Sequence, residues 1–219
     1  MFYILYMNAN AKPELRSIYA RARKELPPFV AERASARIAK HIFSLPRVLE
    51  SGLIAAYCAT GSEVDTAALL EFIIASGRGA ALPYCREDGS MGIGRIWSLH
   101  KDVVPGRFGV MEPADRLKDN VGSEQAEVVI CPGVAFDENL GRLGRGGGHY
   151  DRFLRPLKGK ALIIGCAFDC QISPSPLPTD EHDVSMDVVI TEKRAFPKGS
   201  CPSVTQLEEE EEFQRAAKC

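Results

Sequence analysis

The sequence predicts an α/β protein built on a mostly parallel sheet with helices packed around it. Apolar runs with the length of buried strands lie at residues 53–58, 80–82, 128–131, 161–167 and 186–191. Segments with helical periodicity separate several of these runs, an order that produces parallel strands joined by right-handed crossovers. Ligands of such sheets bind at the carboxyl ends of the strands. The loops that follow Cys58 and Cys131 are therefore expected to meet at one site.

The composition is that of a globular protein. A chain of 219 residues suits one domain, and a hydrophobic fraction of 45% is ample for a buried core. The formal charge of -2 argues against bulk binding of nucleic acid. No apolar run approaches the roughly 20 residues that a membrane helix needs. Residues 1–7 are apolar, but they are too few and lack the basic flank of a signal peptide, and Met7 could be the natural start.

Seven cysteines are scattered through the sequence without a Cys-x-x-Cys pair. An odd count of this kind suits reduced thiols in a cytoplasmic protein. Cys166 and Cys170 lack partner ligands at zinc spacing, so no zinc site is expected. Cys131 follows a buried strand and is expected to pack rather than to react.

The first part of the chain predicts two helices. Residues 11–25 have one apolar face and several basic side chains on the other faces. A Pro-Pro pair ends this helix, and Pro28 can begin the next one, at about residues 29–45. Lys12 and Arg16 lie one helical turn apart and therefore share a face. Solvation explains most of the basic residues of this helix.

The strand at residues 53–58 ends in a polar turn, and a helix is predicted at residues 64–76. Glu63 therefore stands at a strand-to-helix junction. Two interpretations stay open for its carboxylate. It could bind a ligand at the carboxyl edge of the sheet, or it could interact with the dipole at the start of the helix.

The middle of the chain is less regular. A short strand at residues 80–82 is expected to end at Pro83, and a further strand is expected at residues 92–97. Trp97, the only tryptophan, is expected to anchor the core rather than to stack on a ligand. Residues 103–125 are rich in loops and could cover a site.

A glycine-rich loop follows the apolar strand at residues 128–131. Five glycines and two arginines, Arg142 and Arg145, precede a helix that is expected to begin at about Gly148. Free backbone N–H groups at a helix start bind anions, glycines let a phosphate approach the backbone, and arginines match its oxygens. Asp151 could hold a metal ion against the same phosphates.

A glycine-rich surface turn with solvated arginines is the alternative for this loop. The density of glycine and arginine between a strand and a helix favours an anion-binding site instead. The loop is not a Walker A sequence, because no Gly-Lys-Ser/Thr follows. It is not a dinucleotide fingerprint, because His149 stands where a third glycine would be required.

The last part of the chain predicts strands at residues 161–167 and 186–191. Three prolines at residues 174–178 make the segment between them stiff and non-helical. Asp187 lies at the start of the last strand, and the sequence does not decide whether it is buried or exposed. The acidic run at residues 208–212 suits either a disordered end or a solvated helix.

Four segments together resemble one family. The central run Gly-Arg-Leu-Gly-Arg-Gly-Gly-Gly-His-Tyr-Asp at residues 141–151 closely resembles the signature of the 5-formyltetrahydrofolate cyclo-ligases, also called methenyltetrahydrofolate synthetases. Residues 12–16, 62–66 and 182–187 resemble further segments of that family in the same order. The central motif is specific, and the other three are weak singly but strong in that order. The similarity spans about residues 11–192.

This resemblance implies an ATP- and Mg²⁺-dependent ligase that converts 5-formyltetrahydrofolate to 5,10-methenyltetrahydrofolate and releases ADP and phosphate. The reaction would proceed by phosphorylation of the formyl oxygen and ring closure by N10. The implied fold is a three-layer sandwich with a mostly parallel sheet, of the kind shared with sugar-phosphate isomerases and CoA transferases. A single domain is expected at residues 11–195, with terminal extensions at residues 1–10 and 196–219. ATP and a reduced folate are the expected partners, without nucleic acid, membrane or an obligate protein partner, and the expected location is cytoplasmic.

The resemblance also assigns roles to individual residues. Cations of the first helix and the glycine-rich loop would hold ATP: Lys12, Arg16, Arg142, Leu143, Gly144, Arg145, Gly146, Gly147, Gly148, His149 and Tyr150. The folate would be bound by Cys58, Glu63, Arg145, Gly146, Gly147, Gly148 and His149. Asp151 and Asp187 would hold Mg²⁺, and Arg145 and Asp151 would be the catalytic residues. Glu63 would accept from the amino and ring N–H groups of the pterin.

His149 departs from the family pattern, because many relatives carry Tyr-Tyr-Asp where this chain has His-Tyr-Asp. An imidazole can still stack or donate, but it is smaller and titratable. Two alternatives to the active ligase follow. The chain could be a non-catalytic relative that binds folate or nucleotide, or it could be an ATP-dependent ligase for another amide.

Overall fold

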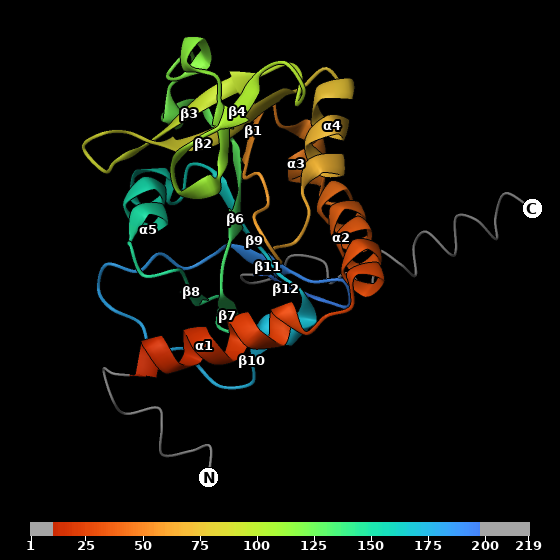
Figure 1. The fold of residues 1–219 in the computed structure, drawn as a ribbon, viewed down its shortest axis with the longest axis vertical. Helices are drawn as coiled ribbons and strands as arrows, with labels where there is room; N and C mark the ends of the chain where they lie inside the picture. The colour runs from red at the N-terminus through yellow and green to blue at the C-terminus, as the bar shows by residue number, and fades with distance from the viewer. Residues whose placement is uncertain (1–10, 198–219) are drawn as a thin grey trace, which may run out of the picture.

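A large central sheet runs through the structure, a computed structural model that describes residues 11–197 (Figure 1). The described residues form seven strands in this sheet, in the spatial order β12 (Ala195–Pro197), β11 (Val188–Ile190), β9 (Leu162–Cys166), β6 (Val128–Pro132), β1 (Leu53–Ala56), β2 (Gly79–Cys85) and β3 (Met91–Ile96). The five inner strands are parallel, and β3 and β12 pair antiparallel at the two edges. The predicted mostly parallel sheet is thereby confirmed.

Helices cover both faces of the sheet. Figure 1 shows α2 (Pro28–Phe43), α3 (Pro46–Glu50) and α4 (Ala67–Ala75) on one face and α5 (His149–Leu154) on the other. Neighbouring side chains of one strand divide between these layers, because they point to opposite faces. Ile130 packs in the cluster that contains the side chains of α2 and α4, whereas Val129 and Cys131 pack with those of α5. The structure is therefore a three-layer α/β sandwich.

Helix α1 (Ala11–Lys24) lies beside a smaller three-stranded sheet, at the lower end of the molecule in Figure 1. Its strands are β10 (Ile172–Ser173), β7 (Ala135–Asp137) and β8 (Arg142–Leu143). The strands β4 (Val103–Pro105) and β5 (Met111–Pro113) form a separate antiparallel pair. Short 3₁₀ helices lie at Arg107–Gly109, Asp115–Leu117, Ser123–Gln125, Arg155–Leu157 and Asp169–Gln171.

Two expectations for the middle of the chain are wrong. Strand β2 continues past Pro83 to Cys85. The parallel pairing of β2 with β1 ends at Ala81, before the proline. Pro83 therefore interrupts no hydrogen bond between these two strands, although it has no N–H to donate. Trp97 is 55% exposed and does not anchor the core. The preceding residue, Ile96, is buried at the end of edge strand β3. Because successive side chains along a strand point to opposite sides, Trp97 points outward, where its ring contacts the guanidinium of Arg95.

Within residues 11–197, no helix is both long and apolar enough to cross a membrane. The five cysteines in this range are free thiols. The apolar residues 1–7 and the acidic run at residues 208–212 lie outside the described residues.

Candidate active site

A pocket of about 610 Å³ lies at the carboxyl edge of the sheet, where the loops after β1 and β6 meet the amino-terminal end of α1. Its lining includes Lys12, Arg16, Cys58, Glu63, Arg142, Leu143, Gly144, Arg145, Gly146, Gly147, Gly148, His149, Tyr150 and Asp151. These are all of the predicted site residues except Asp187. Residues that are far apart in the sequence are thus brought together at the edge of the sheet where ligands of α/β proteins bind.

A buried carboxylate organises the approach to the glycine-rich loop. Asp137 accepts the N–H groups of Asn139 and Gly141 through Oδ1 and that of Leu177 through Oδ2. Beyond this turn, Gly146 and Gly148 have φ angles of 108° and 63°, which L side chains rarely adopt. The loop therefore needs glycine at these two positions before α5 begins.

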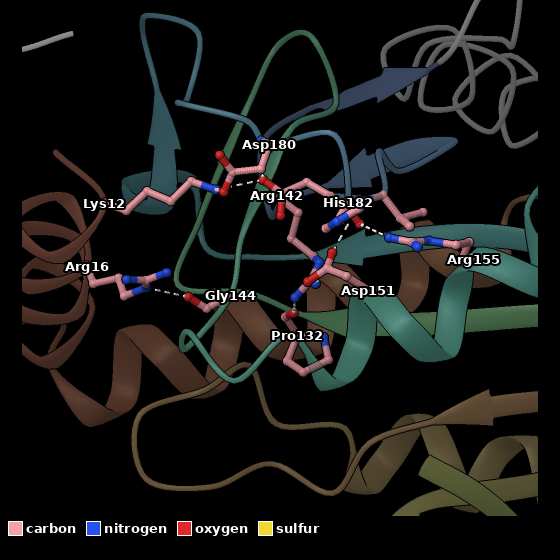
Figure 2. Close-up of polar contacts among 11 residues, drawn as sticks. Lys12, Arg16, Pro132, Arg142, Gly144, Asp151, Arg155, Asp180 and His182 are labelled. Carbon is pink, nitrogen blue, oxygen red and sulfur yellow. Dashed lines mark hydrogen bonds and ion pairs between the residues drawn. The ribbon is translucent and has the colours of Figure 1, made fainter. Parts of the chain in front are cut away.

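Arg142 and Asp151, which both line the pocket, form a largely buried ion pair (Figure 2). Arg142 Nη2 donates to Asp151 Oδ1 at 2.9 Å, and the two side chains are only 3% and 16% exposed. The guanidinium also donates to the Pro132 carbonyl and lies over the ring of Tyr150. Oδ1 of Asp151 also accepts the N–H of Val184. Arg142 is thus bound to the protein itself and holds Asp151 in place.

Arg145 reaches across the pocket to the loop after β1. Its Nη2 lies 2.6 Å from Glu63 Oε1 and 2.5 Å from Thr60 Oγ1. The other oxygen of Glu63 accepts from the N–H and the hydroxyl of Thr60, at 3.0 and 3.1 Å. Helix α4 begins only at Ala67, so the Glu63 carboxylate is directed to the pocket side of its own turn rather than to the helix start.

Lys12 is held between two aspartates at the other end of the pocket. Figure 2 shows its side chain extended toward Asp180, and its Nζ lies 2.6 Å from Asp180 Oδ2 and 2.7 Å from Asp183 Oδ2. Burial opposes the charge of Lys12, but these two hydrogen bonds outweigh it and raise its pKa. Arg155 donates to the carbonyl of His182, so the polar segment around Asp183 is held from both sides. Sequence reasoning noted this polar segment but not its partners.

The same view shows Arg16 beside the glycine-rich loop (Figure 2). Its Nε donates to the Gly144 carbonyl at 2.8 Å, and its guanidinium lies where a side chain on Gly146 would contact it. The first helix is therefore attached directly to the loop, and the shared face of Lys12 and Arg16 lines the pocket.

The third side of the pocket is formed by the ends of β2 and β3 and by the loop before β5. Sequence reasoning missed the lining residues of this side, Pro83, Tyr84, Cys85, Met91, Arg107, Val110 and Glu112, and also Tyr57, which directly follows β1. Burial raises the pKa of the Cys58 thiol to about 11, and burial together with Asp119 raises that of Tyr84 to about 12. These two side chains are neutral near pH 7. Three residues of the segment at residues 103–125, Arg107, Val110 and Glu112, line the pocket.

His149 lies between the glycine-rich loop and the β2–β3 turn. Its Nδ1 is 3.0 Å from the carbonyl oxygen of Gly89 and 3.2 Å from Nη2 of Arg152. The ring both lines the pocket and ties the start of α5 to the turn. The imidazole at this position therefore makes a structural contact whatever it does with a ligand.

Asp187 is not brought into the pocket. It precedes β11 and lies opposite Ile163 at the start of β9, with its Oδ2 accepting the Ile163 N–H at 2.9 Å. This is the amino end of the parallel strands, whereas the pocket lies at their carboxyl ends. In residues 11–197 no three His, Cys, Asp or Glu side chains are grouped so that they could hold a metal ion. The expected pairing of Asp151 with Asp187 is thus not seen.

The family model, the related sequences and a solved structure that resembles this chain all point to one family. The family model described as the 5-formyltetrahydrofolate cyclo-ligase family matches residues 8–192. The 5-formyltetrahydrofolate cyclo-ligase of Mycolicibacterium smegmatis is 29% identical over 87% of this chain and 98% of its own length. The protein of the same name from Escherichia coli K12 is 29% identical over 80% of this chain and 96% of its own. The solution structure of Aquifex aeolicus 5,10-methenyltetrahydrofolate synthetase superposes with a TM-score of 0.76 at 31% identity, covering 87% of this chain and 94% of that one.

Proposed function

The chain belongs to the 5-formyltetrahydrofolate cyclo-ligase family, and we propose from this membership and from the pocket that it catalyses the ATP-dependent conversion of 5-formyltetrahydrofolate to 5,10-methenyltetrahydrofolate. ADP and phosphate are the other products. The enzyme is a ligase that forms a carbon–nitrogen bond.

The observation that carries this proposal is the contact between Arg145 and Glu63. A guanidinium on a glycine-rich loop and a carboxylate from the loop after β1 lie 2.6 Å apart in one pocket. The first is suited to phosphate oxygens and the second to the N–H groups of a pterin. A phosphoryl donor and a folate bound to these two groups would be neighbours, as transfer between them requires.

The reaction needs positioning and charge more than a nucleophilic side chain. The N5-formyl group is amide-like and a poor electrophile. Its oxygen attacks the γ-phosphorus, the bond to the β-phosphate oxygen breaks, and ADP leaves. The lone pair of N10 then attacks the formyl carbon, N10 loses its proton, and the carbon–oxygen bond breaks with departure of phosphate. Arg145 would stabilise the charge on the transferred group.

The two substrates are proposed to bind in different parts of the pocket. The nucleotide phosphates are proposed to lie along the glycine-rich loop between Lys12, Arg16 and Arg145, which supply positive charge. The folate is proposed to lie between Glu63 and the apolar side formed by β2 and β3, with Cys58 among its neighbours. Arg142, buried against Asp151, would act on ATP indirectly.

A single carboxylate at the phosphate end is proposed to hold Mg²⁺. Asp180 and Asp183 are paired with Lys12, and Asp151 is paired with Arg142. Mg²⁺ in nucleotide enzymes is held by one or two carboxylates, with phosphate and water oxygens completing the shell. When bound, the ion would neutralise phosphate charge. We assign Asp151 to hold it, because both protein contacts of this carboxylate are made by Oδ1. Asp187 is not proposed as a Mg²⁺ ligand, because it does not line the pocket.

The activity is tested directly with purified protein. Mg-ATP and 5-formyltetrahydrofolate are expected to give the near-ultraviolet absorbance of the methenyl product, with one ADP formed for each folate converted. Reactions without ATP or with excess EDTA are the controls. No absorbance change at any magnesium or ATP concentration would contradict the proposal. Tight folate binding without turnover would point to a non-catalytic relative, and turnover of another amide in a substrate panel would point to a different ligase.

Lys12 is expected to act mainly on ATP binding. Replacing it with glutamine should raise KM for ATP about tenfold, the equivalent of about 1.4 kcal/mol, because one charged contact to phosphate is lost. KM for the folate should stay unchanged. The exposed Lys24 at the end of the same helix provides the matched control, and its glutamine variant should behave as wild type. Equal KM values for ATP in the two variants would remove Lys12 from the nucleotide site.

A cytoplasmic location stays a prediction. It is supported by the five free thiols among the described residues, since disulfides form mainly in oxidising compartments.

A further inference from the structure

Both oxygens of Glu63 accept hydrogen bonds from groups of the protein itself. Oε2 accepts from the backbone N–H and the hydroxyl of Thr60, while Oε1 accepts from Arg145. The Thr60 hydroxyl also accepts from Arg145 at 2.5 Å. A pterin that is to donate to this carboxylate must therefore replace an existing partner.

The three partners differ in how easily they can leave. Glu63 has a side chain that is only 7% exposed, and the N–H of Thr60 is fixed by its turn. Arg145 is 57% exposed and lies between two glycines, Gly144 and Gly146, which allow the backbone more conformations than other residues do. Arg145 is the partner that can move.

We propose that Arg145 and the folate compete for the same acceptor, Oε1 of Glu63. When ATP binds, Arg145 moves to the ATP phosphates, and Oε1 then accepts a hydrogen bond from the folate. Thr60 is the positioning residue that keeps the carboxylate in place during this exchange. The inference rests on the proposed function and deepens it, because it predicts that the two substrates bind with positive coupling.

The physical reason is the cost of breaking the ion pair between Arg145 and a carboxylate that is only 7% exposed. Without nucleotide, the folate must separate Arg145 from Glu63 before it can bind, and that cost weakens its affinity. With nucleotide bound, the phosphates become the new partner of Arg145, and an N–H group of the folate donates to Oε1 of Glu63 in its place. Coupling between two sites is reciprocal, so the folate must tighten nucleotide binding by the same factor.

The exchange is tested by calorimetry with 5-formyltetrahydrofolate, in the absence and presence of saturating Mg-AMP-PNP, which cannot transfer its phosphoryl group. In the wild-type protein, the Kd for the folate is expected to fall roughly fivefold or more when the analogue is present. In Arg145→Gln, folate affinity without nucleotide should equal or exceed that of the wild type, and the analogue should change it less than twofold. Direct contact between the two ligands would instead leave the coupling intact in this variant.

Thr60 has a matched pair of variants. Thr60→Val keeps the shape and the backbone N–H but removes the hydroxyl, and it should raise KM for the folate several-fold with little change in KM for ATP. Thr60→Ser restores the hydroxyl and should recover the wild-type value.

The outcomes separate the two proposals. Turnover with a folate Kd that the analogue does not change in the wild type would overturn the exchange alone. Full coupling in Arg145→Gln would do the same. Absence of turnover in the wild type would overturn the proposed function and the exchange with it.

Discussion

Replacement of Arg145 by glutamine is expected to lower kcat by about 100- to 1,000-fold, the usual effect of removing one group that stabilises transition-state charge. The guanidinium lies in the pocket beside Glu63, so it is placed where a phosphoryl group would pass to a bound folate. Steady-state kinetics with both substrates saturating measure this loss. Because Arg145 is 57% exposed, its replacement should change the thermal midpoint by only a few degrees.

A lysine at position 145 distinguishes the effect of the positive charge on kcat from the effect of the planar guanidinium. Arg145→Lys keeps the positive charge but loses the fork that binds two oxygens at once, so an intermediate kcat is expected. Arg152 on α5 provides a control, because it is also an exposed arginine near the loop but does not line the pocket. Arg152→Gln should retain a kcat within a few-fold of the wild type. Near-normal kcat in Arg145→Gln would place the reacting phosphoryl group elsewhere.

Replacement of Asp151 by alanine is expected to destabilise the fold by about 3–5 kcal/mol, because it leaves the buried guanidinium of Arg142 without a counter-charge. Arg142 is only 3% exposed and its Nε has no hydrogen-bond partner among the described residues, so the Pro132 carbonyl and the ring of Tyr150 would be left to compensate without a carboxylate. Urea unfolding monitored by circular dichroism measures the free energy of unfolding. The alanine variant of Asp180, a carboxylate that is 71% exposed, should change it by no more than about 0.5 kcal/mol.

Two further variants separate the structural role of Asp151 from its proposed role toward Mg²⁺. Asp151→Asn can still accept from Arg142 and Val184, so it should lose less stability than the alanine variant but still lose most of its turnover. A double variant with apolar residues at Arg142 and Asp151 should lose less stability than the sum of the single variants. A loss below about 1 kcal/mol in Asp151→Ala would mean that the buried ion pair does not form in solution.

The sheet and the glycine-rich loop could be predicted because their signals are local. Five-residue apolar runs such as β6 and β9 carry their own burial pattern, and the loop between β8 and α5 carries a dense motif. Strands β7, β8 and β10 have only two or three residues, too few to show any periodicity. They exist because Asp137 and the pairing with neighbouring segments hold them.

The convergence of the site could be predicted from topology, but its contacts could not. That the loops after β1 and β6 meet follows from the parallel sheet. The contact of Arg145 with Thr60 joins residues that are 85 positions apart, and that of Lys12 with Asp183 joins residues 171 positions apart. Asp187 is the opposite case, because it matches a family segment but lies at the amino end of its strand, outside the pocket lining. The sequence already placed it at the start of the last strand, and its proposed role toward Mg²⁺ came from the family resemblance alone.

The most direct test of the account follows the formyl oxygen. In the proposed reaction, this oxygen accepts the γ-phosphoryl group and then leaves with it. Turnover of 5-formyltetrahydrofolate labelled with ¹⁸O in the formyl group, followed by mass spectrometry of the released phosphate, reports its fate. We expect the label to appear in inorganic phosphate in proportion to the methenyl product formed. Unlabelled phosphate from a reaction that still forms the methenyl product would contradict it.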